Sequence, residues 1–542
     1  MHSAKRTMKI AFVPLILFFI LFLAAPMLMT IWQSLSTDRV LSIRPYLEIL
    51  TSSEIVIAMW NSLKVSSVSA LATTGIAFLL AYSIEMTNVV KPAKKFIQLG
   101  ITLPMFLPTI TYGFVLIYVF GNQGLLTKLM GKPLFTIYGS NGLLVGYILY
   151  TLPAAFILIQ NAFQYVDKRF LLVSDLMGDR VLRKFYHTIF RPMLGAIGGA
   201  FVLSFVLSFT DFGIPASIGG TYEVIATTLY QTMLGSIPNF QQGAVISVLM
   251  LVPAIVSVVL LGALEKLNFQ QTTISVTELS SNRWRDITFG TVATIVAIAV
   301  IGIFVIMFIA PFTVAYPFNL TFTLDFLKRF IQMDELMTVY GHSILVALFT
   351  AIVGVFVAFA SALLSARTTV KGRKAFDLIA MMTNTIPGMV LGLSYLFLFN
   401  NSSLKGTFLI IIICNIVHLF TTPYLMAKNA LQKMNSNWEV IGELLQDSWL
   451  QTVFRVIIPN VKSTIIEMFS YFFINAMVTV SGVIFLVSTE TSLVSAKIKE
   501  LQHFNKFNDI FILSIFILAT NVLIKLICEF WLYKQKKKEN AK

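Results

Sequence analysis

The residue types that perform enzymatic chemistry are few in this chain, and their spacing matches no familiar catalytic motif. Gly131 and Lys132 resemble part of a phosphate-binding loop, but Pro133 follows them and the upstream glycine is missing. HExxH, CxxC and GxSxG do not occur, and the five histidines are scattered. The two cysteines, Cys414 and Cys528, lie inside apolar segments, which excludes a disulfide framework. We therefore expect no enzyme, no metal site and no cofactor held by this chain.

The composition is that of a chain solvated mostly by lipid. Of its 542 residues, 57% are hydrophobic and only 12% are charged, whereas a soluble chain carries about 25% charge. The net charge is +15, which in a soluble protein would suggest nucleic acid as a partner. Here Lys and Arg collect in alternate loops, as in the cytoplasmic loops of multi-pass membrane proteins. The expected partner is the lipid bilayer, and nucleic acid is not expected.

Twelve apolar segments are long enough to cross a bilayer, for which about 20 residues are needed. They lie near residues 10–33, 57–84, 97–121, 142–163, 192–216, 241–263, 287–314, 341–366, 376–400, 406–428, 460–486 and 508–531. Basic residues follow every second segment, for example at Lys91–Lys95, Lys168–Lys184 and Lys534–Lys538, which places both termini in the cytoplasm. The predicted fold is all-α and polytopic, with twelve transmembrane helices.

The two halves of the chain repeat each other. Pro108 matches Pro387 and Gly113 matches Gly392, both pairs at the same spacing along the chain. Six spans return the chain to the same side of the membrane, so the repeats are parallel and a central pathway is expected between them. The predicted organisation is a first six-span half over 1–263, a polar cytoplasmic linker over 264–286 and a second six-span half over 287–542.

One cytoplasmic stretch is duplicated most clearly. Residues 440–459 repeat the stretch at 172–191 in the first half. The matched pairs include Asp175 with Glu443, Leu176 with Leu444, Asp179 with Asp447 and Leu182 with Leu450. Apolar residues at helical spacing predict one short amphipathic helix in each copy. These residues are Phe170, Val173, Met177, Val181 and Phe185 in the first copy, and Trp438, Ile441, Leu445, Trp449 and Val453 in the second. Each helix could simply lie on lipid headgroups, but two copies at equivalent places favour contact with two copies of a partner.

At this stretch the sequence resembles the integral-membrane permeases of binding-protein-dependent ABC importers. Those permeases carry a cytoplasmic loop of the form E-A-A-x-x-x-G, followed thirteen residues later by Pro. In the second copy Gln446 stands at the Gly place and Pro459 at the Pro place. In the first copy Gly178 keeps the Gly place, while Arg191 stands at the Pro place. The residues at the E-A-A places are Val440, Ile441 and Gly442, and Leu172, Val173 and Ser174.

The resemblance implies a role for each loop. In the family the loop docks on an ATP-binding subunit, so the implied partners are two copies of an ABC ATPase and an extracellular or periplasmic solute-binding protein. ATP is then bound by partner subunits, and the implied location is the bacterial cytoplasmic (inner) membrane. The residues expected to make the two contacts are Leu172, Ser174, Asp175, Gly178, Asp179, Val181, Leu182 and Phe185, and Gly442, Glu443, Leu445, Gln446, Asp447, Trp449, Leu450 and Pro459.

A second set of polar residues lies within or near the predicted spans. Asp211 and Gly213 occur where one span ends, and Thr479 and Ser481 occupy the matched place in the other half. Charged and polar groups inside a membrane are costly and often line a substrate path. The alternative for Asp211 is a cap on a broken helix ahead of Pro215.

Two other classes of protein fit less well. A proton-coupled secondary transporter also has twelve spans in two parallel halves, and Asp179-Arg180 with Arg183-Lys184 resembles a loop of that class. That loop follows the fourth predicted span rather than the second, and its inner glycine is missing. A membrane scaffold or receptor would not need a duplicated cytoplasmic helix. For the substrate, the resemblance extends to importers of 2-aminoethylphosphonate, ferric iron, thiamine and polyamines. The stretch around Asp211 most resembles the 2-aminoethylphosphonate and ferric-iron branches, and of these two we expect the phosphonate.

Overall fold

The computed structural model describes residues 12–37, 40–265, 282–435 and 437–539. The basic segment at Lys5–Lys9 and most of the predicted linker over 264–286 lie outside the described residues. The helices of the first half are α2 (Ala25–Leu35), α3 (Arg44–Thr51), α4 (Ser53–Glu85), α5 (Lys91–Thr102), α6 (Thr109–Phe120), α7 (Leu125–Met130), α8 (Ser140–Phe163), α9 (Arg169–Leu176), α10 (Val181–Phe185), α11 (Arg191–Thr210), α12 (Gly213–Ile218), α13 (Ile225–Leu234) and α14 (Phe240–Glu265).

The second half has a similar order of helices, but residues 408–433, which match α8, form two helices, and residues 481–486, which match α12, form turns. Its helices are α15 (Arg283–Ile309), α16 (Asp325–Gln332), α17 (Asp334–Arg367), α18 (Ala375–Thr385), α19 (Gly388–Phe399), α20 (Phe408–His418), α21 (Thr421–Lys433), α22 (Asn437–Leu444), α23 (Trp449–Thr452), α24 (Ile458–Asn460), α25 (Lys462–Val478), α26 (Val494–His503) and α27 (Phe507–Glu539). Two short antiparallel hairpins were not predicted, β1 (Ser36–Thr37) with β2 (Val40–Leu41) and β3 (Thr313–Ala315) with β4 (Asn319–Phe322).

The described residues contain nine helices that are long and apolar enough to cross a membrane, or eleven if two bent pairs each count as one span. The bent pairs are α18 with α19, at 105°, and α20 with α21, at 54°. The predicted span at 460–486 corresponds to α25, which has only 17 residues and is followed by turns. An all-α polytopic fold is therefore confirmed, whereas the count of twelve and the orientation stay predictions.

Two predicted spans are broken at matched prolines. The segment at 97–121 divides into α5 and α6, and the segment at 376–400 divides into α18 and α19. Pro108 caps α6 and Pro387 caps α19, and the residue before each proline is extended. A proline disfavours helical backbone at the residue before it, so each span must bend at this place. The break directs α6 and α19 toward the region where the halves meet.

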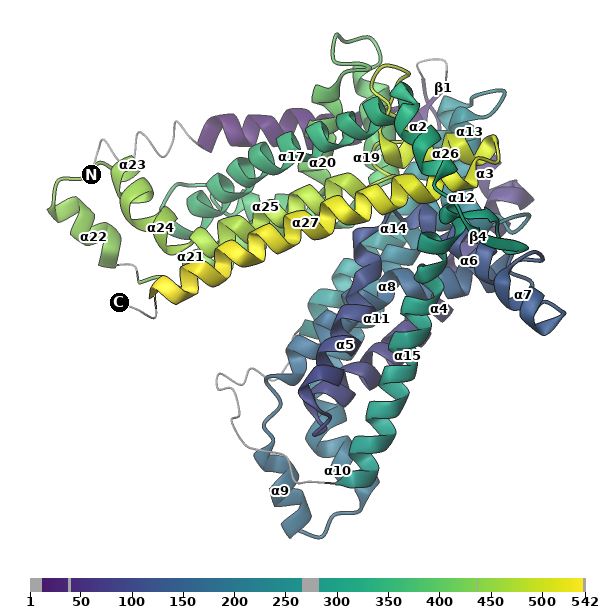
Figure 1. Cartoon of the computed structure of the whole chain (residues 1–542). Coiled ribbons are helices and arrows are strands. Elements are labelled where there is room, and N and C mark those ends of the chain that lie inside the picture. Colours follow the sequence, from purple (N-terminus) through teal and green to yellow (C-terminus); the bar gives the residue numbers. More distant parts are fainter. Residues whose placement is uncertain (1–11, 38–39, 266–281, 436, 540–542) are drawn as a thin grey trace.

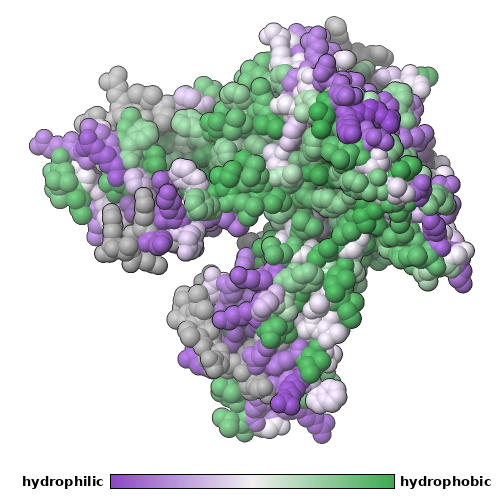
Figure 2. All heavy atoms as spheres, in the orientation of Figure 1, coloured by the Kyte–Doolittle hydropathy of each residue, from purple (hydrophilic) through white to green (hydrophobic). Residues whose placement is uncertain are grey.

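The helices form two arms that diverge from a common region (Figure 1). One arm contains α4, α8 and α11, which pack on one another, and ends at α9 and α10. The other contains α17, α21 and α25 and ends at α22 and α23. Small residues allow the close approach of helices within an arm: Thr73 Oγ1 of α4 lies 3.0 Å from Thr151 Oγ1 of α8, and Gly354 of α17 faces Phe472 of α25. Open space separates the two arms (Figure 2).

The first helix of each half packs against the other half. α2 lies on α19, where Thr30 Oγ1 donates to Ser394 Oγ at 2.7 Å. α15 lies on α4, α5 and α6, where Ser83 Oγ donates to the Phe289 carbonyl at 2.8 Å. Hydropathy identifies these helices as spans but carries no information on their neighbours. The packing units therefore cross the sequence boundary between the halves.

Candidate functional site

Each copy of the duplicated segment forms a helix, a tight turn and a second helix. The prediction of one continuous amphipathic helix in each copy is therefore wrong. Residues 177–180 separate α9 from α10, and residues 445–448 separate α22 from α23. The cause lies at matched places, because Gly178 has φ +68° and Gln446 has φ +62°. A helix cannot continue through this left-handed conformation, which is typical of a helix C-terminus.

The two turns share one hydrogen-bond pattern. The Asp179 amide donates to the Ser174 carbonyl at 3.1 Å, and the Asp447 amide donates to the Gly442 carbonyl at 2.9 Å. Both bonds run from the residue after the left-handed position to the fifth residue before it, which defines a Schellman cap. Gly442 is buried here, and a Cβ at this position would lie 2.6 Å from Thr452 Oγ1. The structure thus aligns the two copies in the register that the sequence predicts.

The left-handed backbone at Gln446 leads to a testable prediction, because only glycine adopts this conformation without a steric penalty. Replacing Gln446→Gly is expected to stabilise the second turn by about 1 kcal/mol, slowing hydrogen exchange at the Asp447 amide. The matched control is Gln451→Gly, in the right-handed helix α23, which should weaken the same loop. Faster exchange in Gln446→Gly would contradict the prediction.

The third residue of each turn is an aspartate, which forms an ion pair with an arginine of the same loop. Asp179 accepts a hydrogen bond from Ser174 Oγ at 2.9 Å, and Arg183 Nε lies 3.4 Å from its carboxylate. In the second copy Arg455 Nη1 lies 3.1 Å from Asp447 Oδ1. Exposed ion pairs contribute about 0–1 kcal/mol each. Both pairs join the turn to the helical segment that follows it.

Both turns present apolar side chains to solvent. Leu176, Met177, Val181 and Leu182 are 89%, 74%, 81% and 82% exposed, and Leu444, Leu445 and Leu450 are 77%, 72% and 48% exposed. Trp449, at the place of Val181, packs back against the core of its arm. Hydrophobic atoms accordingly show among hydrophilic ones at the ends of both arms (Figure 2). We call these two sets the apolar tips. Exposed apolar clusters of this kind mark interaction sites.

The remaining predicted loop residues take several places. Leu172 is exposed. Asp175 Oδ1 forms an ion pair at 2.5 Å with Lys184 of α10. Phe185 packs inward, and Pro459 lies in the first turn of α24, where proline is readily accommodated. Glu443 lies on α22, but its side chain is outside the described residues. Asp175, Phe185 and Pro459 therefore support the loops rather than extend the apolar tips.

Asp211 and Gly213 lie at the start of α12. The Ile214 amide donates to Asp211 Oδ2 at 2.8 Å, and the aspartate side chain is buried. This bond is the one expected of a helix cap, the alternative that the sequence left open. A Cβ at Gly213 would lie 2.2 Å from Thr109 Oγ1, so α12 packs closely on the start of α6.

Thr479 and Ser481 occupy the equivalent place in the second half. Thr479 Oγ1 donates to the Asn475 carbonyl at 2.7 Å, at the end of α25. Ser481 Oγ would lie 2.8 Å from a Cβ at Gly388, the first residue of α19. All four predicted pathway residues therefore lie where a short broken segment packs on α6 or α19. Their role in lining a pathway stays a prediction.

A cavity of about 1290 Å³ lies at the far end from the tips, between α13, α17 and α26, and the sequence did not predict it. Lys497 is buried in its wall and forms ion pairs with Glu335 and, at 2.7 Å, with Glu500. Burial disfavours the charge on Lys497, but the two carboxylates raise its pKa above the ordinary value. Among the described residues no group of three or more His, Cys, Asp or Glu side chains could hold a metal ion.

These features define a class of protein. A duplicated multi-pass fold, with matched apolar tips on two arms and a polar cavity at their junction, is that of a two-half membrane permease. The family model of binding-protein-dependent transport system inner membrane components matches residues 73–270 and 354–534. The chain belongs to this family, so it is an inner-membrane, multi-pass permease component of an ABC importer and not an enzyme.

Individual relatives agree with this assignment. The chain is 26% identical to a ferric transport system permease of Haemophilus influenzae, over 82% of this chain and 72% of the relative. It is 25% identical to the ferric transport system permease of Actinobacillus pleuropneumoniae, over 83% and 67%. A spermidine/putrescine transport system permease homologue of Mycoplasma genitalium is 28% identical over 32% of this chain and 58% of the relative. Family membership implies that a separate ATPase hydrolyses ATP and that a binding protein is a partner.

Proposed function

We propose that this chain forms the translocation pathway of a ferric-iron importer and that each apolar tip docks one copy of a separate ATPase subunit. One observation carries the docking proposal. The same left-handed turn, an aspartate paired with an arginine and three of the four exposed apolar positions recur in both halves, at the ends of the two arms (Figure 1). Two equivalent contacts on one chain fit two copies of one partner.

The arrangement of the arms suggests how the subunits would act. With twelve spans and cytoplasmic termini, both tips face the cytoplasm and the cavity faces outward. The tips stand apart, so this conformation is open to the cytoplasm. ATP binding would draw the two ATPase subunits together and bring the tips with them, which opens the outer side to a loaded binding protein. Hydrolysis would then reset the arms. The conformational work passes through two short helix–turn–helix units, so their anchoring decides the coupling.

The proposed substrate rests on the relatives. Two relatives, each aligned over more than four-fifths of this chain, are named as ferric transport system permeases. Of the two substrates that the resemblance around Asp211 suggested, they favour ferric iron over 2-aminoethylphosphonate. The partner implied by the family, a solute-binding protein, would provide most of the selectivity. The permease itself needs only a compatible lining.

The test is purification of the tagged chain from native membranes together with its bound subunits. We expect an ATPase with a phosphate-binding loop at two copies per permease, and uptake of radiolabelled ferric iron by proteoliposomes that contain the complex, the binding protein and internal ATP. Uptake of 2-aminoethylphosphonate instead would overturn the substrate but keep the class. If no ATPase copurifies and uptake follows a proton gradient, the docking proposal fails.

A further inference from the structure

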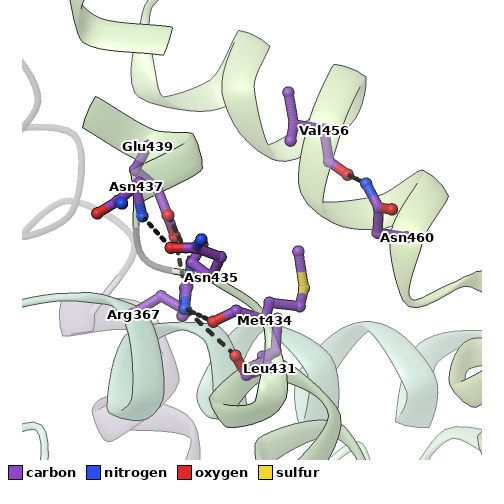
Figure 3. Close-up of polar contacts among 8 residues, drawn as sticks. All are labelled: Arg367, Leu431, Met434, Asn435, Asn437, Glu439, Val456 and Asn460. Atoms are coloured by element: carbon purple, nitrogen blue, oxygen red, sulfur yellow. Dashed lines mark hydrogen bonds and ion pairs between the residues drawn. The ribbon is translucent and has the colours of Figure 1, made fainter. Parts of the chain in front are cut away.

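Arg367, the last residue of α17, joins three elements of the second arm (Figure 3). Its Nη1 donates to the Met434 carbonyl at 2.9 Å and to the Leu431 carbonyl at 3.3 Å, both at the end of α21. Its Nη2 donates to the Asn435 carbonyl at 3.0 Å. Nε and Nη2 also form a two-point ion pair with Glu439 in the first turn of α22. All five guanidinium donors are thereby used.

The surroundings of this junction make it rigid. The Arg367 side chain is only 7% exposed, whereas Glu439 is 23% exposed. A two-point arginine–carboxylate pair fixes both distance and orientation, which a lysine at this place could not do. The helix that carries Glu439 is short and packs on α23, so this pair provides a direct polar link from α22 to the membrane helices.

The matched positions of the first arm carry residues that cannot form such an ion pair. Asn88 stands at the place of Arg367 in the alignment that matches Pro108 with Pro387, and Leu171 stands at the place of Glu439 in the alignment of the two loops. Neither is charged, and Leu171 packs against the core of its arm instead. The two tips share a turn and a surface, but they are attached to their arms by different interactions.

We infer that Arg367 is a positioning residue that transmits movement of α22 to α17 and α21, so that coupling through the second tip depends on its ion pair with Glu439. The inference rests on the proposed function, because it requires a subunit that moves α22. It predicts that breaking the pair separates ATP hydrolysis from transport without releasing the ATPase. A bond that merely stabilised the fold would lower both activities together.

The experiment uses the complete complex in proteoliposomes and measures substrate transported per ATP hydrolysed. Glu439→Gln, which keeps the side-chain volume, should retain the ATPase and its hydrolysis but lower transport per ATP about tenfold. Arg367→Gln also removes the bonds to three carbonyls, so it should lower the ratio at least as much. The double variant should be no worse than Arg367→Gln alone, because the pair with Glu439 is already lost in that variant. Asp377→Asn is the matched control. It breaks an ion pair with Lys428 that joins α18 to α21 in the same arm and does not involve α22, so it should leave the ratio unchanged.

Each other outcome has a definite meaning. Unchanged transport per ATP in Glu439→Gln would overturn the inference, and so would additive losses in the double variant. Loss of the ATPase from Glu439→Gln alone would show that Glu439 contacts the ATPase directly, which also overturns it while the proposed function stands. If the unmodified chain binds no ATPase, the proposed function itself fails. Should Arg367→Gln not accumulate in the membrane, Glu439→Gln carries the test.

Discussion

Replacing two leucines of the second apolar tip, Leu444→Asp with Leu445→Asp, is expected to release an ATPase subunit while the chain stays in the membrane. Both side chains are more than two-thirds exposed, so the substitutions do not disturb a core. Large apolar residues at the centre of an interface commonly contribute about 2 kcal/mol or more each, and a buried unpaired carboxylate adds a further cost. Association should weaken by about 30-fold or more.

The measurement is the number of ATPase subunits that copurify with the permease, read from native mass spectrometry. One subunit should remain after the second tip is changed, and one after the equivalent change in the first tip, Leu176→Asp with Met177→Asp. Changing both tips should leave none. Leu129→Asp on α7 is the control, since Leu129 is as exposed but lies at the other end of the molecule. Two retained subunits in every variant would refute docking at the tips.

Replacing Trp449 is expected to have a different effect from replacing the exposed leucines. The sequence placed it among the residues expected to contact a partner, yet its ring packs against the arm, whereas Leu444 and Leu445 protrude. Trp449→Ala would therefore act mainly by loosening the loop. Helical periodicity assigned Trp449 to an outward face because it treated α22 and α23 as one helix. The left-handed residue Gln446 turns the second helix away from that face.

The sequence predicts features that depend on residues close together along the chain better than features that depend on contacts between distant residues. Span positions follow from local hydropathy, and the two loops from direct comparison of the halves. Most predicted spans therefore coincide with long helices or bent helix pairs, although the count of twelve stays a prediction. The broken spans also had a local signal, in Pro108 and Pro387. Gln446 gave no local signal, because glutamine seldom adopts the left-handed conformation. Only its match with Gly178 suggests a left-handed residue at this place.

Contacts between residues far apart in the sequence gave no local signal of this kind. Arg367 and Glu439 are 72 positions apart, and in the sequence Arg367 is only one of the basic residues that set orientation. The packing of α2 and α15 on opposite halves likewise depends on surfaces that form only after folding. One sequence thus indicates the loops at which a partner is expected to bind, but not how these loops are attached to the rest of the molecule.

At the outer side, a contact between the halves is expected to hold the cavity end closed. Lys499 of α26 donates from Nζ to the Ala216 carbonyl of α12 at 2.9 Å, and Gln502 donates to the same oxygen at 3.3 Å. Ala216 lies in the last turn of α12, where carbonyls lack helical partners. A hydrogen bond from a charged donor contributes about 1.5–3 kcal/mol, and it exists only while the two halves meet at this place.

Removing this contact with Lys499→Met and Gln502→Ala should therefore shift the equilibrium toward the outward-open conformation by about tenfold or more. In the proposed mechanism, closure of the ATPase subunits accompanies that conformation. ATP hydrolysis without the binding protein should therefore rise, and stimulation by the loaded binding protein should shrink. Lys497→Met is the matched control on the same helix. Its ion pairs with Glu335 and Glu500 stay within the second half, so a well-packed methionine should leave basal hydrolysis unchanged. Equal basal rates in the double variant and the unmodified complex would mean that the Ala216 contact does not control opening, and that closure of the outer side depends on helix packing alone.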